Sequence, residues 1–209
     1  MPKLAKIVPI IIVACLAAGG IALGQSDDRQ PVEFARESPG EFQFVRLAYA
    51  PNRFANTGGR RQAWETDYPD AEHHFVKGVS RLTTVDAAEN GQVLTPLDAD
   101  IFDYPWIYAV EVGHWYLNTQ EAARMREYLL RGGFLMVDDF HGAWEWAQFK
   151  SSMERVFPDR PIVEIPEGDE AFHVLYDLDQ RIQIPSRMYI YSGQTWERDG
   201  RYPHWRGIY

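Results

Sequence analysis

A short apolar segment within residues 132–142 limits the fold more than any other part of the chain. A glycine pair precedes the apolar run at 134–137, and polar residues follow it. A run this short, bounded by turn-forming residues, is typical of an inner strand of a parallel sheet. Open α/β sheets bind their ligands beyond the carboxyl ends of the strands. We therefore expect Asp138, Asp139 and His141 to lie at a binding site.

The residues before this segment complete a βαβ unit. Residues 105–111 are rich in β-branched and aromatic side chains, which predicts a strand. A helix is expected at 119–131, because Asn118 and Glu121 have the spacing of a capping box. Strands joined by such a helix are parallel, so both loops should emerge at one edge of the sheet. The loop after the first strand contributes the candidate ligand-binding residues Glu111, His114 and Trp115.

Further elements extend this unit into a layered α/β domain. We expect a mostly parallel sheet with helices on both faces. The remaining predicted elements are strands at 42–49 and 161–165, helices at 71–82 and 143–157, and a hairpin formed by 187–191 and the segment after Gly200.

A long polar loop follows the first predicted strand. Loops of this length between regular elements are more often functional than not. Its arginines and glycine pair would suit an anionic ligand, and a solvated loop without a ligand is the alternative. Its candidate ligand-binding residues are Arg53, Trp64, Asp67 and Tyr68.

The first 24 residues have the pattern of a secretory signal peptide. Two lysines precede an apolar run, and small residues occupy positions 22 and 24, ahead of a polar segment. An uncleaved membrane anchor is one alternative, and a lipoprotein modified at Cys15 is another. Residues 25–40 are expected to be a linker. The sequence thus predicts an exported, periplasmic domain that contacts a membrane only through residues 1–24, if these are retained.

Cysteine content and charge exclude several classes of function. Cys15 is the only cysteine, so a domain without residues 1–24 has no disulfide, cysteine nucleophile or thiolate metal site. The net charge is −9 at pH 7 and the chain has no basic run, which argues against a nucleic-acid partner. The composition predicts no oligomeric state.

Several short motifs together resemble DUF4159, a bacterial family of unknown function. They are Phe44 to Tyr49, Trp64 to Pro69, Gly113-His114, Gly132 to Leu135, Asp138-Asp139, Phe157-Pro158 and Tyr176 to Leu178. The resemblance covers residues 41–209. It implies a flavodoxin-like fold similar to class I glutamine amidotransferases and ThuA-like proteins. Family members usually continue beyond a segment like 202–209, so the resemblance also implies a C-terminal truncation. It brings no activity with it.

Amidotransferase activity is not expected, because the turn after the central strand holds Asp138-Asp139-Phe140-His141 and no cysteine. Two hypotheses assign the site a function, and a purely structural or interaction role is the remaining alternative. We favour binding of a polar small molecule or glycan, with aromatic residues stacking on the ligand. The alternative is a metal-assisted hydrolase with a divalent metal ion, for which the candidate ligands are His114, Asp139 and His141. No other cofactor is predicted. Either hypothesis expects Glu111, His114, Asp139 and His141 in one crevice.

Overall fold

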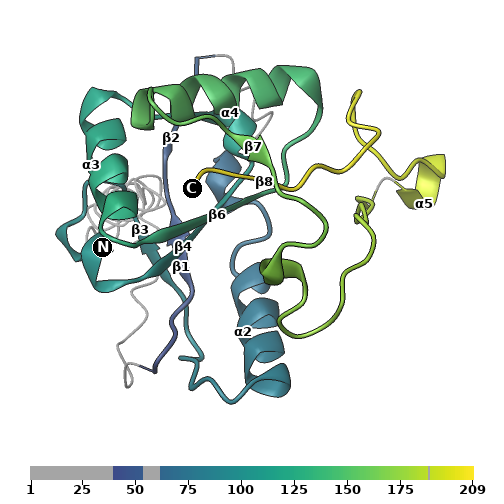
Figure 1. Cartoon of the computed structure of the whole chain (residues 1–209), viewed down its shortest axis with the longest axis horizontal. Helices are drawn as coiled ribbons and strands as arrows, with labels where there is room; N and C mark the ends of the chain where they lie inside the picture. Colours follow the sequence, from purple (N-terminus) through teal and green to yellow (C-terminus); the bar gives the residue numbers. More distant parts are fainter. Residues whose placement is uncertain (1–39, 54–61, 188) are drawn as a thin grey trace, which may run out of the picture. The chain divides into compact units, whose positions relative to one another are not determined.

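The computed structural model describes residues 40–53, 62–187 and 189–209. The predicted signal peptide and linker, and the middle of the 50–69 loop, lie outside these residues. A four-stranded parallel sheet with strand order β3-β1-β4-β6 forms the centre of the described chain (Figure 1). Its strands are β1 (Val45–Leu47), β3 (Gln92–Leu94), β4 (Trp106–Val110) and β6 (Phe134–Asp138). The predicted α/β class with a parallel sheet is confirmed.

The βαβ unit forms as predicted, but the prediction of an inner strand at 134–137 is wrong: β6 is an edge strand of the described sheet, and Phe134 is 58% exposed. β4 and β6 pair in parallel from Trp106 opposite Phe134 to Val110 opposite Asp138. Helix α3 (Thr119–Leu130) connects them. The Asn118 side chain accepts hydrogen bonds from the first-turn amides of α3, and the Glu121 side chain accepts one from the Asn118 amide. This capping box fixes the start of the helix and therefore the length of the loop before it.

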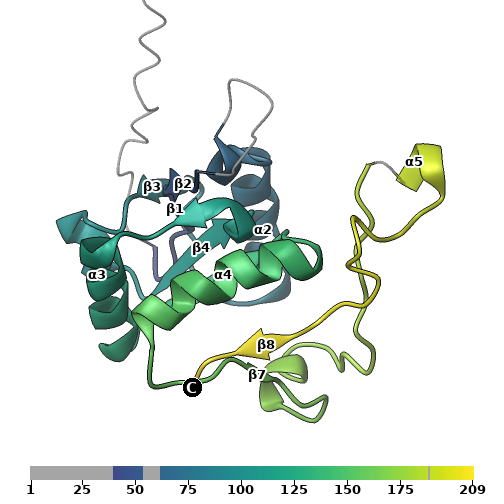
Figure 2. The same cartoon turned by 90° about the horizontal axis from the view of Figure 1, so that it is seen from above.

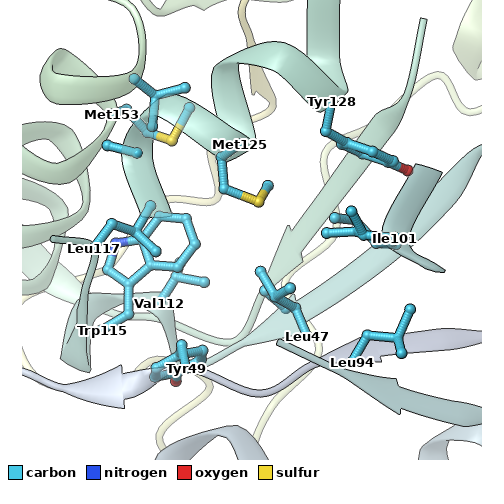
Figure 3. Close-up of a cluster of buried hydrophobic side chains, with 14 of the residues drawn as sticks. Leu47, Tyr49, Leu94, Ile101, Val112, Trp115, Leu117, Met125, Tyr128 and Met153 are labelled. Carbon is cyan, nitrogen blue, oxygen red and sulfur yellow. The ribbon is translucent and has the colours of Figure 1, made fainter. Parts of the chain in front are cut away.

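Helices cover both faces of the sheet, as the alternation of side chains along the strands requires (Figures 1 and 2). Leu47, Ile107 and Ala109 face α3 and α4 (Gly142–Val156), and belong to one core with Met125 and Met153. Figure 3 shows Leu47, Met125 and Met153 in this core. The other face packs against α2 (Asp70–Leu82) through Phe44, Val76, Tyr108 and Val110. Fully burying one such aliphatic or aromatic side chain contributes roughly 1.5–3 kcal/mol. The helices thus hold the carboxyl edge of the sheet between two packed layers.

A small second sheet joins the two loops at the carboxyl edge. Strand β2 (Ala50–Pro51) pairs antiparallel with β5 (Trp115–Tyr116). The 3-10 turn η3 (Val112–His114) lies between β4 and β5. Other 3-10 turns are η1 (Ala63–Glu65), η2 (Ala99–Asp103) and η4 (Glu170–Phe172). The chain after β1 therefore supports the turn that carries His114.

The C-terminal segment, residues 166–209, differs from the prediction. Residues 189–192 form a short helix, α5 (Tyr189–Ser192), and the predicted strand at 187–191 is wrong. Instead, β8 (Arg206–Gly207) pairs antiparallel with β7 (Val163–Glu164). β-Branched and aromatic residues favour strands only where a pleated surface is partly buried. Ile190 and Tyr191 are 77% and 80% exposed, so they lack that surface.

Within residues 40–53, 62–187 and 189–209, no helix combines the length and the apolar character that a membrane span requires.

Candidate functional site

The first part of the site is the turn after β4. Glu111 adopts a left-handed backbone (φ 52°), which ends the strand and starts η3. Two buried residues from the chain after β1 hold this turn. The Asn52 amide donates to the His114 carbonyl at 2.7 Å, and the Tyr49 hydroxyl lies 2.7 Å from the Val110 carbonyl oxygen. The His114 side chain is therefore presented from a backbone that is fixed on both sides.

The second part is the first turn of α4, which approaches η3 very closely. A Cβ on Gly113 would lie 2.4 Å from Cβ of Glu145, so this contact requires glycine. The Glu145 side chain is only 2% exposed, and its Oε1 lies 3.2 Å from Nε2 of His114. The same nitrogen lies 3.7 Å from Oε2 of Glu111. One histidine thus lies between two carboxylates.

Charge and burial together shift the pKa of each of these groups. Burial raises the pKa of Glu111 to about 7, and the negative charges of Asp139 and Glu145 add to this effect. The hydrogen bond to Glu145 raises the pKa of His114, although burial opposes the change. Burial alone would raise the pKa of Glu145, but hydrogen bonds from His114 and from the His141 amide lower it. Glu145 is therefore a buried carboxylate that stays ionised.

The third part is the loop after β6. Asp139 also has a left-handed backbone (φ 55°), and its Oδ1 lies 3.0 Å from Nε2 of His141. This hydrogen bond raises the pKa of His141 against the effect of burial. The His141 backbone amide donates to Oε2 of Glu145. Glu145 therefore connects the loop after β6 to the turn after β4.

The site has a group of atoms suited to a metal ion. Glu111, His114 and Glu145 each provide one ligand atom, a carboxylate oxygen or an imidazole nitrogen. These three atoms lie within 4.8 Å of one another. Carboxylate oxygen and imidazole nitrogen bind zinc at about 2.0–2.2 Å, so atoms bound to one ion lie roughly 3–4 Å apart. A small inward movement of the side chains would complete such a site.

The sequence comparison identifies the family. The family model DUF4159, described as a domain of unknown function, matches residues 43–209. The chain belongs to DUF4159. The comparison with curated proteins gives no match. The site of this DUF4159 domain lies entirely within the matched residues, and its chemistry has to be inferred from its geometry.

The structure of this DUF4159 domain brings together some of the predicted site residues. His114 lies between Glu111 and Glu145, and His141 binds Asp139 beside them. The predicted metal ligands His114, Asp139 and His141 are therefore neighbours, but His141 is paired with Asp139. Glu111 and Glu145 are the carboxylates that approach His114.

Other predicted residues lie elsewhere. Asp138 is on the α2 face of the sheet, where its Oδ2 lies 3.5 Å from the Tyr108 hydroxyl. Trp115 is 1% exposed and stacks on Phe149 in the core, so its ring is not available to a ligand. This corrects its assignment as a ligand-binding residue. Asp138 is the last residue of β6, and the left-handed backbone of Asp139 turns the next carboxylate toward His141. Pairing of β5 with β2 places Trp115 in the core.

The predicted residues of the 50–69 loop lie around a buried arginine. The carbonyls of Trp64 and Thr66 each accept a hydrogen bond of 2.9 Å from the Arg46 guanidinium. The Tyr68 ring lies 5.6 Å from the same guanidinium, and Asp67 is in a left-handed turn before it. Arg53 lies in the turn after β2. Arg46 thus positions this loop, and only the loop's two ends are described.

Sequence reasoning missed two residues of the site. Glu145 lies at a core-facing position of α4, on the same side as Phe149, Ser152 and Val156. A charged residue at such a position is the signal that could have identified it. Arg198, from the C-terminal segment, lies 2.7 Å from Oε1 of Glu145. Only the folded chain brings it there, so no local pattern predicts it.

Proposed function

We propose that this DUF4159 domain binds a divalent metal ion through Glu111, His114 and Glu145 and uses it to hydrolyse a polar substrate. The observation that carries the proposal is the approach of three ligand atoms to within 4.8 Å of one another. Glu111 and His114 belong to η3 and its N-cap, and Glu145 belongs to α4. Burial of an ionised carboxylate such as Glu145 is costly unless a cation balances it. Arg198 does so in this structure, and a metal ion would do so in its place.

The neighbouring pair Asp139 and His141 supports hydrolysis. A bound divalent metal ion lowers the pKa of a coordinated water molecule and polarises a substrate oxygen. Asp139 orients the His141 ring through the 3.0 Å hydrogen bond. A histidine held in this way can accept a proton from an attacking water molecule. The two loops would then have separate roles, one in metal binding and one in proton transfer.

Metal analysis tests this proposal. The purified protein is stripped with a chelator, loaded with zinc or manganese, desalted and analysed for bound metal. We expect one equivalent in the wild type and a loss in His114→Ala and Glu145→Gln. Asp138→Asn is the matched control, because Asp138 lies on the opposite face of the sheet and should leave the metal content unchanged. A wild-type protein that retains no metal would overturn the proposal.

Binding of a polar small molecule or glycan, the hypothesis favoured from the sequence, is the second candidate. Trp144 supports it: the side chain is 41% exposed and its ring lies 6.0 Å from the His114 ring. An exposed aromatic face beside carboxylates suits a sugar ring and its hydroxyl groups. The burial of Trp115 leaves fewer aromatic rings for such a ligand, so we rank this function second. Ligand-induced thermal shifts with oligosaccharides should disappear in Trp144→Ala if it is correct.

The finer description of the fold is also a proposal. The parallel strands follow the order β3-β1-β4-β6, which in chain order is the second, first, third and fourth strand. This is the order of flavodoxin-like sheets, which bind ligands where the direction of winding reverses, between the first and third strands. Here that point lies between β1 and β4, where Tyr49 and Glu111 meet. The agreement supports the predicted resemblance to class I glutamine amidotransferases.

Export to the periplasm rests on the pattern of residues 1–24 alone. We propose that a signal peptidase removes this segment. Mass spectrometry of the periplasmic protein should then find an N-terminus near Gln25. A protein that still begins at Met1 in the membrane fraction would favour the anchor.

A further inference from the structure

The C-terminal segment returns to the proposed metal site through a short turn at residues 197–200. Arg198 lies in this turn with a left-handed backbone (φ 51°), which is unfavourable for a residue with a side chain. Its Nη2 lies 2.7 Å from Oε1 of Glu145. The same oxygen lies 3.2 Å from Nε2 of His114. A guanidinium therefore occupies the carboxylate oxygen that faces the proposed metal position.

Asp199 fixes the same turn to the beginning of α4. The Ala143 amide donates to the Asp199 carboxylate, with oxygen atoms at 3.1 and 3.3 Å. A carboxylate at this position is also stabilised by the helix dipole. A Cβ on Gly142 would lie 2.0 Å from Oδ1 of Asp199, so glycine makes this close approach possible. The turn thus has two charged contacts with the site, one of each sign.

We propose that the 197–200 turn is a latch that competes with the metal ion for Glu145 and is released when the metal binds. The inference rests on the proposed function. Both oxygens of Glu145 already have partners: Oε2 accepts a hydrogen bond from the His141 amide, and Oε1 lies 3.2 Å from Nε2 of His114 and forms an ion pair of 2.7 Å with Arg198. A metal ion on Oε1 would place a second positive charge next to the guanidinium. Arg198 and the metal ion therefore weaken each other's binding to Glu145.

The surroundings of the latch allow it to open. The Arg198 side chain is half-exposed, and Tyr191 and Tyr202 on either side of the turn are 80% and 78% exposed. Segments with few buried contacts open at low free-energy cost, without unfolding of the core. Coupling between two binding events is reciprocal. The closed latch therefore lowers the metal-binding constant by the same factor by which bound metal lowers the equilibrium constant for latch closure.

Zinc affinity measured by competition with a chromophoric chelator tests the latch. The proteins compared are the wild type, Arg198→Gln, Asp199→Asn and Arg201→Gln. We expect Arg198→Gln to bind zinc about tenfold more tightly, since couplings of this kind are on the order of 5–150-fold. Asp199→Asn should show a smaller gain. Arg201→Gln is the matched control, because Arg201 lies over the Trp196 ring in the same segment, and its affinity should stay unchanged.

Hydrogen exchange gives an independent measurement on the same four proteins. Zinc should accelerate exchange of the Ala143 amide in the wild type, because Asp199 leaves it. In Arg198→Gln this amide should already exchange faster without zinc. Equal zinc affinity in the wild type and Arg198→Gln would overturn the latch and leave the metal site standing. Absence of zinc binding in all four proteins would overturn both.

Discussion

The two faces of the sheet each bury a carboxylate next to a cationic side chain, and the two pairs differ in kind. On the α2 face, Arg46 is fully buried and its Nε donates to Glu72. The same guanidinium donates to two carbonyls of the 62–69 loop. On the α4 face, Glu145 has His114 and the half-exposed Arg198 as partners.

The difference separates a structural ion pair from an adjustable one. An arginine keeps its charge at every pH at which proteins fold, and all the partners of Arg46 named above lie within the packed domain. A histidine changes its charge near neutral pH, and Arg198 belongs to a segment with few buried contacts. The α2 face thus stabilises the fold, whereas the α4 face carries groups that can exchange partners. Four predictions test this contrast.

The largest effect is expected for Arg46→Met. The substitution leaves Glu72 buried without its partner, so the free energy of unfolding should fall by about 3–5 kcal/mol. Urea denaturation followed by tryptophan fluorescence measures it. The control is the double variant Arg46→Met with Glu72→Leu, which removes both charges and should be more stable than the single variant. If the double variant had the same free energy of unfolding as the single variant, the Arg46–Glu72 ion pair would not have the structural role described above.

The pH dependence of stability should distinguish the α4 face. Burial raises the pKa of Glu111 from 4.5 to about 7, so the folded state binds this proton more tightly than the unfolded state. The resulting stability is fully present below pH 4.5 and is lost as the pH rises through about 7. At 1.36 kcal/mol per pKa unit, the loss is on the order of 3 kcal/mol. Glu111→Gln should flatten this part of the profile. Parallel profiles for the two proteins would show that Glu111 does not titrate as expected.

Gly113→Ala should have a moderate effect. The new methyl group would lie 2.4 Å from Cβ of Glu145, which forces η3 and α4 apart. Overpacking of this kind costs about 1–3 kcal/mol, and zinc binding should weaken with it. Gly78→Ala is the matched control on α2, because no atom lies within 4 Å of its new Cβ. Alanine there should raise stability by about 0.5–1 kcal/mol, as measured by thermal denaturation.

The smallest effect should separate the two consecutive aspartates. Asp139→Asn removes the charge next to His141 and should lower the pKa of that ring, because the hydrogen bond to the Asp139 carboxylate raises it. Asp138→Asn should leave this pKa unchanged, since Asp138 lies beside Tyr108 on the other face. Titration of the histidine ring signals by NMR measures the His141 pKa in both variants. The same shift in the two variants would mean that the aspartates act as one group.

Local patterns predicted the part of the fold in which neighbours in the sequence are also neighbours in space. The βαβ unit from β4 to β6 depends on one capping box and two apolar runs, and both are visible in the sequence. Asp139 and His141, both expected at the site, also lie within one loop, although their pairing was not predicted. These features are local, so periodicity and spacing were sufficient.

Contacts between distant residues were not predicted. Glu145 belongs to the site only because Gly113 lets α4 approach the turn after β4. Arg198 reaches the site from more than 50 residues further along the chain. Trp115 was expected to face a ligand, but pairing of β5 with β2 places it in the core. Glu145 carried one local signal, a charge at a core-facing position of α4. The partners of Glu145, and the positions of Arg198 and Trp115, depend on tertiary packing.

The consecutive placement of Asp138 and Asp139 on opposite faces makes the length of β6 as important as its composition. Loss or gain of one residue between Phe134 and Asp138 would reverse the orientation of every side chain after it. Leu135 and Met136 of β6 would tolerate exchange for one another, because their volumes are similar. In an inherited or engineered collection of variants, we therefore expect this strand to accept many substitutions and no change in length.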